Sequence, residues 1–122
     1  MLQVREQQHH TTKVFTLTGQ YGRRTTPGIQ ARILGAKEMG IHHIILDFSG
    51  VTEIDSTSLS KLFLWYHNMK PYNVELSVVK PQPYIRYHSD WTPLSEIVSI
   101  YASEEDAVEH IEEAMKNAAV CS

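Results

Sequence analysis

The residues best placed for chemistry are four consecutive polar side chains, Asp55-Ser56-Thr57-Ser58. They follow a strand-like apolar run ending at Phe48, and a helix-like apolar spacing starts directly after them at Leu59. At a helix start, an Asp, Ser or Thr side chain accepts a hydrogen bond from a backbone N–H two or three residues later. A hydroxyl there is also exposed and could carry a phosphoryl group, whose charge the helix dipole stabilises. The pattern leaves both roles open, helix cap and phosphoacceptor, and they are compatible.

The other polar residues give no signal for catalysis, a metal or a cofactor. No two of the 7 histidines stand at i, i+4 spacing on an expected helix. Adjacent histidines such as His42 and His43 point to opposite faces of a strand, so they chelate one ion poorly. Asp47 and Asp55 have neither a nucleophile–base constellation nor a Gly-rich phosphate loop beside them. We therefore expect a protein that is not an enzyme, with no metal and no cofactor.

Length and composition predict one globular domain spanning residues 1–122, with a core of about 2–117. The formal net charge of −3 argues against a nucleic-acid partner, which needs a basic surface. A single cysteine, Cys121, permits no disulfide framework. No stretch approaches the roughly 18 apolar residues of a membrane span, so we expect no membrane insertion. Low cysteine use is consistent with a reducing cytoplasm, and we expect a cytoplasmic location.

The elements that must position the polar segment alternate between strand and helix. Strands are expected at residues 2–4, 13–18, 41–48, 74–79 and 97–100, and helices at 27–39, 56–69, 84–88 and from 103 to beyond 115. Residues 19–26 and 49–55 are expected to be loops. Alternation of this kind predicts an α/β fold with a mixed, partly parallel sheet and about four helices.

The helix expected at residues 56–69 has two different sides. Its buried stripe is predicted to consist of Leu59, Leu62, Phe63 and Tyr66, at i, i+3, i+4 and i+7 spacing. Leu64 falls on the opposite side, with polar neighbours. We hypothesise that the exposed residues form a docking patch for a partner protein, made of Ser56, Ser60, Lys61 and Leu64.

The segment Ile54-Asp55-Ser56-Thr57-Ser58-Leu59 resembles the signature of the STAS family, which includes the bacterial anti-sigma-factor antagonists. Family members carry a hydrophobic-Asp-Ser-Ser/Thr-Gly-Leu segment between a strand and a helix. Leu17-Thr18-Gly19 is similar to the family's strand-ending motif, and Ser103 to Ala107 is similar to its final helix start. The resemblance covers most of the chain and implies a single STAS-like domain, with a mixed sheet and about four helices packed mainly on one side.

The resemblance implies a regulatory function. In the family's antagonists, a partner anti-sigma factor that is a serine kinase phosphorylates the serine after the aspartate, and phosphorylation ends the binding. That role would fall on Ser56, with Thr57 as the fallback acceptor. Asp55 and Ser58 would flank the acceptor in the partner-binding surface, and the kinase would supply the nucleotide.

Two departures from the family pattern bear on the partner. Ser58 replaces the usual glycine, and Tyr21 stands where an acidic residue is common in a partner-contacting loop. The adjacent Arg23 and Arg24 make this loop basic, and they could contact a phosphate or be ordinary surface residues. These departures keep an alternative open, in which the domain is a constitutive structural subunit of a signalling scaffold or of a membrane transport complex, without switching.

Overall fold

A computed structural model describes residues 2–22, 24–69, 74–81 and 98–121. Five strands form one sheet in the order β1-β2-β3-β4-β5. The strands are β1 (Leu2–His9), β2 (Thr12–Tyr21), β3 (His43–Ile54), β4 (Glu75–Val79) and β5 (Ser99–Tyr101), and the helices are α1 (Thr26–Glu38), α2 (Ser56–Met69) and α5 (Glu104–Cys121). β1 is antiparallel to β2, and every other neighbouring pair is parallel. The predicted α/β fold with a mixed sheet is confirmed.

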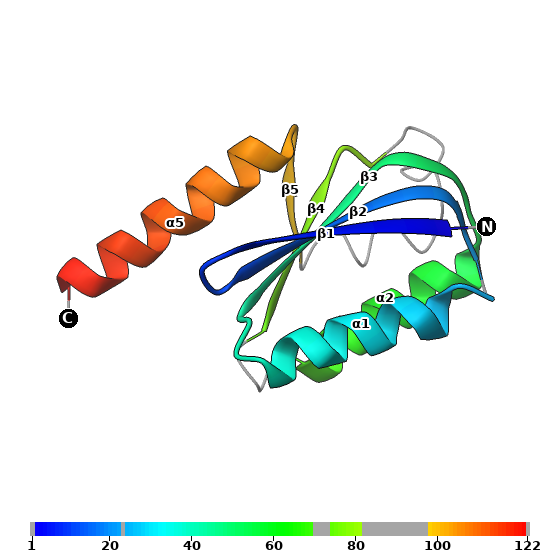
Figure 1. Cartoon of the computed structure of the whole chain (residues 1–122), viewed down its shortest axis with the longest axis horizontal. Helices are drawn as coiled ribbons and strands as arrows, with labels where there is room; N and C mark the ends of the chain where they lie inside the picture. The colour runs from blue at the N-terminus through cyan, green and yellow to red at the C-terminus, as the bar shows by residue number, and fades with distance from the viewer. Residues whose placement is uncertain (1, 23, 70–73, 82–97, 122) are drawn as a thin grey trace.

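The helices cover both faces of the sheet unequally. α1 and α2 lie side by side on one face, whereas α5 lies on the other side and extends away from the sheet (Figure 1). The larger core includes Phe15, Leu46 and Ile33, and it joins α1 and α2 to the sheet. On the opposite face, a small cluster of Val14, Ile45 and Val79 packs against Ala107 and Ile111 of α5. The described part of the chain thus has three helices, two of them on one face; the short helix predicted at 84–88 lies outside the described residues.

The prediction for the first strand was too short. β1 continues past Val4 to His9 and pairs along its whole length with β2, from Leu2↔Gly19 to His9↔Thr12. A two-residue turn joins them, and His10 in this turn has a positive φ of 56°. The residues that extend β1 are mostly polar and exposed, so hydrogen bonding to β2 forms the strand without an apolar pattern of its own.

The two predicted loops, at residues 19–26 and 49–55, are partly strand in the structure. β2 runs on to Tyr21 and β3 runs on to Ile54, where the chain was expected to leave the sheet. Their parallel pairing continues through two irregularities, between Thr16 and Thr18 and between Gly19 and Gln20. Each irregularity adds a residue to β3, so its buried side chains after Phe48 are Val51 and Ile54, spaced by three. Buried residues three positions apart lack the two-residue alternation from which a strand is predicted.

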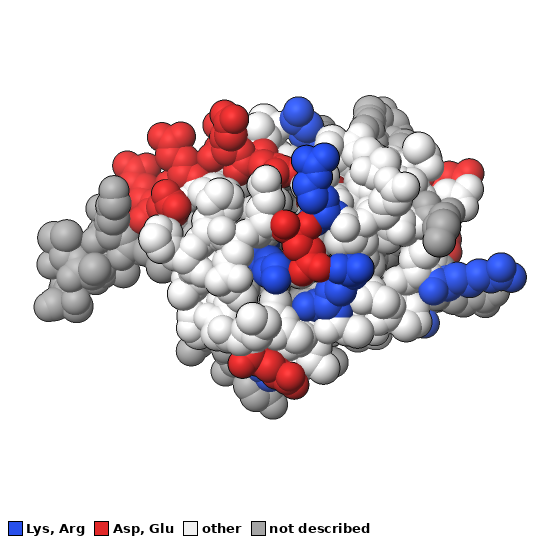
Figure 2. Space-filling model, viewed as in Figure 1, with Lys and Arg blue, Asp and Glu red and all other residues white. Residues whose placement is uncertain are grey.

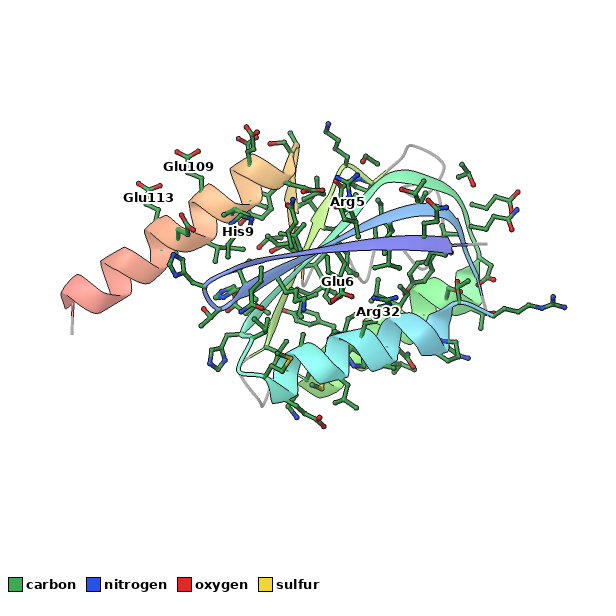
Figure 3. All side chains as sticks on the ribbon, viewed as in Figure 1. Arg5, Glu6, His9, Arg32, Glu109 and Glu113 are labelled. Carbon is green, nitrogen blue, oxygen red and sulfur yellow. The ribbon has the colours of Figure 1, made fainter. Side chains whose placement is uncertain are left out.

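Ion pairs join the edge strand β1 to β2 and to α1. The carboxylate of Glu6 in β1 pairs with Arg32 of α1 and, at 3.1 Å, with Lys13 of β2. Figure 3 shows Glu6 and Arg32 facing each other between the strand and the helix. Both pairs are at least partly open to solvent, and such pairs contribute on the order of 0–1 kcal/mol each, so they orient the edge strand more than they stabilise it.

The helices α5 and α1 begin with different cap arrangements. The hydroxyl of Ser103 accepts a hydrogen bond of 3.1 Å from the backbone N–H of Asp106, so Ser103 caps α5. α1 begins one residue earlier than predicted, because Thr25 occupies the cap position and Thr26 is already helical. Thr25 makes no side-chain cap bond to α1, and its hydroxyl has a different role described below.

Candidate functional site

A groove of about 900 Å³ lies where β2 and β3 end and the chain enters α1 and α2. The carboxyl ends of parallel strands are the usual place for binding sites in α/β sheets. Three segments line the groove: Gln20, Tyr21, Gly22, Arg24 and Thr25; Thr52, Glu53 and Ile54; and Asp55 and Thr57. The polar segment singled out in the sequence therefore borders a concave surface.

Asp55 is the cap of α2. Its Oδ1 accepts a hydrogen bond of 2.7 Å from the backbone N–H of Ser58, three residues later. The capping role predicted for this segment is confirmed and belongs to the aspartate. The Ser58 side chain is fully buried, so the expectation that Ser58 contributes to the exposed partner surface is wrong. The helix turns this side chain inward toward the sheet, on the same side as Leu62.

The position of Tyr21 also differs from the predicted exposed loop. It is the last residue of β2, its side chain is only 1% exposed, and its ring packs edge-to-face on Phe48 with 5.9 Å between centroids. Burial raises the pKa of the Tyr21 hydroxyl, and the nearby Asp55 carboxylate raises it further. Tyr21 is thus a core residue that forms part of the groove floor, and the predicted exposed loop contact is wrong.

The turn between β2 and α1 is held by Thr25. Its hydroxyl accepts a hydrogen bond of 2.9 Å from the Gly22 N–H and donates one of 3.0 Å to the Gly22 carbonyl. A Cβ atom at Gly22 would lie 3.3 Å from Oδ2 of Asp55, so this turn passes close to the α2 cap. The turn brings Arg24, which is exposed, to the same groove as Asp55. Arg23 lies outside the described residues.

The outer side of α2 carries the other predicted contact residues. Ser56 is the first residue of this helix. Lys61 and Leu64 are exposed, Leu64 by 57%, and Ser60 is half-buried. Leu62 and Tyr66 are buried, as the predicted stripe required. The structure therefore brings Ser60, Lys61 and Leu64 to the surface of the helix that starts at Ser56.

Sequence reasoning missed a second polar cluster, on the opposite face of the sheet. The Thr16 hydroxyl donates a hydrogen bond of 2.7 Å to Oε2 of Glu104, and Asp47 accepts one of 2.8 Å from the Ser49 N–H. A hydrogen bond with Asp47, together with burial, raises the pKa of Glu104. Burial acts to raise the pKa of Asp47, but hydrogen bonds from Glu104 and Ser49 lower it overall. These residues come from distant parts of the chain, so no local spacing could have paired them.

The described residues give two negative findings. Among them, no group of three or more His, Cys, Asp or Glu side chains is arranged to hold a metal ion. No helix in the described ranges combines the length and apolar character needed to cross a membrane. Acidic side chains are instead gathered along α5, as Figure 2 shows.

Comparison with known proteins decides the family. A family profile described as STAS domain matches residues 2–107, which is most of the chain. This chain belongs to the STAS domain family. No protein with curated annotation matches the sequence significantly.

Several solved structures of STAS-fold proteins are similar to this one. Bacillus SpoIIAA in its phosphorylated form has a TM-score of 0.71 at 19% identity, covering 89% of this chain and 99% of its own. An anti-sigma factor antagonist from Mycobacterium paratuberculosis has a TM-score of 0.77 at 20% identity, covering 92% and 95%. The murine anion transporter Slc26a9 has a TM-score of 0.71 at 17% identity, covering 88% of this chain but 18% of the transporter. At these identities the similarity establishes the fold.

Proposed function

We propose that this STAS domain binds a partner protein, an anti-sigma factor with serine kinase activity, and that phosphorylation of Ser56 controls the affinity. One observation carries the proposal. Ser56 begins α2 directly after the capping Asp55, between two residues in the sequence that line the groove, and on the helix that exposes Lys61 and Leu64. A modification at Ser56 would thus change the charge of the surface on which a partner would dock.

The charge of a phosphoryl group at Ser56 would change partner binding more than it would change folding. A phosphoryl group adds roughly −1.5 to −2 charges at neutral pH. The helix dipole stabilises an N-terminal negative charge by about 0.3–1 kcal/mol, which offsets repulsion from the neighbouring Asp55. The fold can therefore accept the modification. A partner whose surface complements the unmodified helix start would meet a new, unpaired charge and dissociate.

The comparisons support this proposal at the level of the family. The similar solved structures include proteins described as anti-sigma factor antagonists, one of them in both unphosphorylated and phosphorylated forms. We propose further that the chain acts as one non-catalytic domain over residues 1–122, without a cofactor, in the cytoplasm. In this scheme the partner kinase brings the nucleotide.

A pull-down with three versions of the protein tests the proposal. Wild type, Ser56→Ala and Ser56→Asp are used as baits in lysate of the source cells, and bound proteins are identified by mass spectrometry. We expect wild type and Ser56→Ala to retain a serine kinase that Ser56→Asp loses. Retention of the same proteins by all three baits would contradict control by Ser56.

A second candidate is a constitutive structural subunit, and two observations favour it. The same fold occurs inside an anion transporter, and the position flanking the acceptor segment, Ser58, is fully buried and not the glycine that is usual in the family. In this case all three baits would retain scaffold or membrane transport proteins equally.

A further inference from the structure

α5 is attached to the sheet through a small apolar contact. It is the one described helix on its face of the sheet, and its C-terminal part extends away from the strands (Figure 1). Of the α5 side chains that the structure describes, only Ala107 and Ile111 are buried. They pack with three sheet residues, Val14, Ile45 and Val79. Because so little apolar area holds α5, a polar contact at its first turn can decide whether the helix stays docked.

Glu104 supplies that polar contact. It stands three residues before Ala107, so the two side chains lie on the same side of α5, toward the sheet. Its Oε2 accepts the 2.7 Å hydrogen bond from the Thr16 hydroxyl of β2. The Glu104 carboxyl also shares a hydrogen bond with Asp47 of β3, a residue that is only 6% exposed. One carboxyl group thus joins the first turn of α5 to two central strands.

Charged groups of both signs surround this acid pair, which consists of Asp47 and Glu104. The sheet side supplies two cations and one donor, which are Arg5 of β1, Lys80 after β4 and the Ser49 N–H. The helix supplies further carboxylates, which are Glu105, Asp106, Glu109 and Glu112. Among the described residues, no lysine or arginine forms an ion pair with either member of the acid pair. A shared proton is therefore what joins the two carboxyl groups.

A groove beside this junction leaves room for the helix to move. It has a volume of about 390 Å³ and separates the first turns of α5 from the hairpin of β1 and β2. Glu104 and Val108 line it from the helix, and His9 and Val14 line it from the strands. The first turn of α5 can therefore move away from Asp47 without displacing another described helix.

We propose that the acid pair is a pH-sensitive latch, which holds α5 on the sheet while the two carboxyl groups share a proton and opens when that proton is lost. Opening transfers one proton from the Glu104 carboxyl to water and leaves two carboxylates within hydrogen-bonding distance, where they repel each other. The hydrogen bond with Asp47, and then burial, raise the pKa of Glu104, which is consistent with Glu104 holding the proton. The open state uncovers the apolar residues of the sheet beneath α5. The latch does not involve Ser56, so failure of either proposal leaves the other intact.

Methyl NMR of the whole chain across pH tests the latch. NOEs from the methyl groups of Ala107 and Ile111 to those of Val14 and Ile45 report the closed state. The NOE between Val14 and Ile45, which are partners in neighbouring strands, is the internal reference. From about pH 4 to about pH 8, a range that includes a raised carboxyl pKa, the ratio of closed to open molecules should fall about tenfold. A change of this size corresponds to the loss of one hydrogen bond to a charged group.

Variants at the acid pair identify the group that titrates. Glu104→Gln and Asp47→Asn each keep a hydrogen bond across the pair but remove one titrating carboxyl group, so both should stay closed at every pH. Glu105→Gln, at an exposed position on the same helix turn, should open as wild type does. Helix-to-sheet NOEs that do not change with pH in wild type, or that are lost equally in both pair variants, would overturn the proposal. Simultaneous loss of the Val14–Ile45 NOE would show unfolding of the sheet and would overturn it as well.

Discussion

The Thr16 hydroxyl of β2 donates a 2.7 Å hydrogen bond to Glu104, the first residue of α5. The same Glu104 carboxyl shares a hydrogen bond with Asp47 of β3, so two acids meet where the helix joins the sheet. A hydrogen bond between two carboxyl groups requires one proton. Positive charge near the pair comes from Arg5 of β1 and from Lys80 after β4. This polar contact between α5 and the sheet therefore depends on protonation, in addition to the apolar packing of Ala107 and Ile111.

The acid pair predicts how stability varies with pH. Because the pKa of Glu104 is raised in the folded protein, its contribution is present below the unfolded-chain pKa and is lost as pH rises through the folded value. Because the pKa of Asp47 is lowered, its contribution is lost as pH falls through its own folded value. The pair should therefore stabilise the fold most between these two values. Glu104→Gln keeps a donor for Asp47 and an acceptor for Thr16 without titrating, so it should abolish the loss on the alkaline side.

Urea denaturation across pH measures this difference. Above the folded pKa of Glu104, the variant should be more stable than wild type by roughly 0.5–1.5 kcal/mol, the usual net value of one hydrogen bond. Glu105→Gln, an exposed neighbour on the same helix turn, serves as the control and should follow wild type. Parallel pH curves for wild type and Glu104→Gln would show that the pair does not hold a proton.

The cap of α2 predicts a stability cost at Asp55. Asp55→Ala removes the acceptor for the Ser58 N–H and should lower the free energy of unfolding by about 1 kcal/mol. Asp55→Asn retains an oxygen acceptor and should lose much less. Thermal or urea unfolding of both variants gives the comparison. Equal losses in both would indicate that the carboxylate charge matters more than the cap bond.

Gly50 should be intolerant of a larger residue. A Cβ atom there would lie 2.9 Å from the carbonyl oxygen of Leu17 and 3.0 Å from the Thr18 hydroxyl, because an irregularity in the β2–β3 ladder brings the two chains close. Gly50→Ala should cost about 1–3 kcal/mol through overpacking against fixed backbone. Gly35→Ala in α1 has open space around the new methyl group and should gain about 0.5–1 kcal/mol from helix propensity. A neutral Gly50→Ala would mean that the ladder adjusts.

Substitution of Leu64 should affect partner binding without affecting folding. Its side chain is 57% exposed on α2, so Leu64→Asp should change the free energy of unfolding by less than about 1 kcal/mol. The same variant should fail to retain the partner in the pull-down. Leu62→Ala is the matched opposite, because Leu62 is 3% exposed and its truncation should cost about 2–5 kcal/mol. A comparable stability loss in Leu64→Asp would place this residue in the core.

Elements whose signals are local could be predicted from the sequence. The burial of Leu62 and Tyr66 in α2, the central run of β3, a cap within residues 55–58 and the cap at Ser103 follow from periodicity and from side-chain bonds to backbone three residues away. Such interactions are encoded within one or two turns of chain. The alternation of strands and helices likewise sufficed to predict the mixed sheet.

Features that depend on pairing between distant segments could be seen only in three dimensions. Irregular pairing with β2 extends β3 through Val51 and Ile54, and this extension carries Tyr21 into the core. The acid pair and the groove shared by Arg24 and Thr57 join residues from separate elements. A one-dimensional spacing cannot show which strand ends meet, because that depends on register and on bulges, and these are fixed only when the sheet forms.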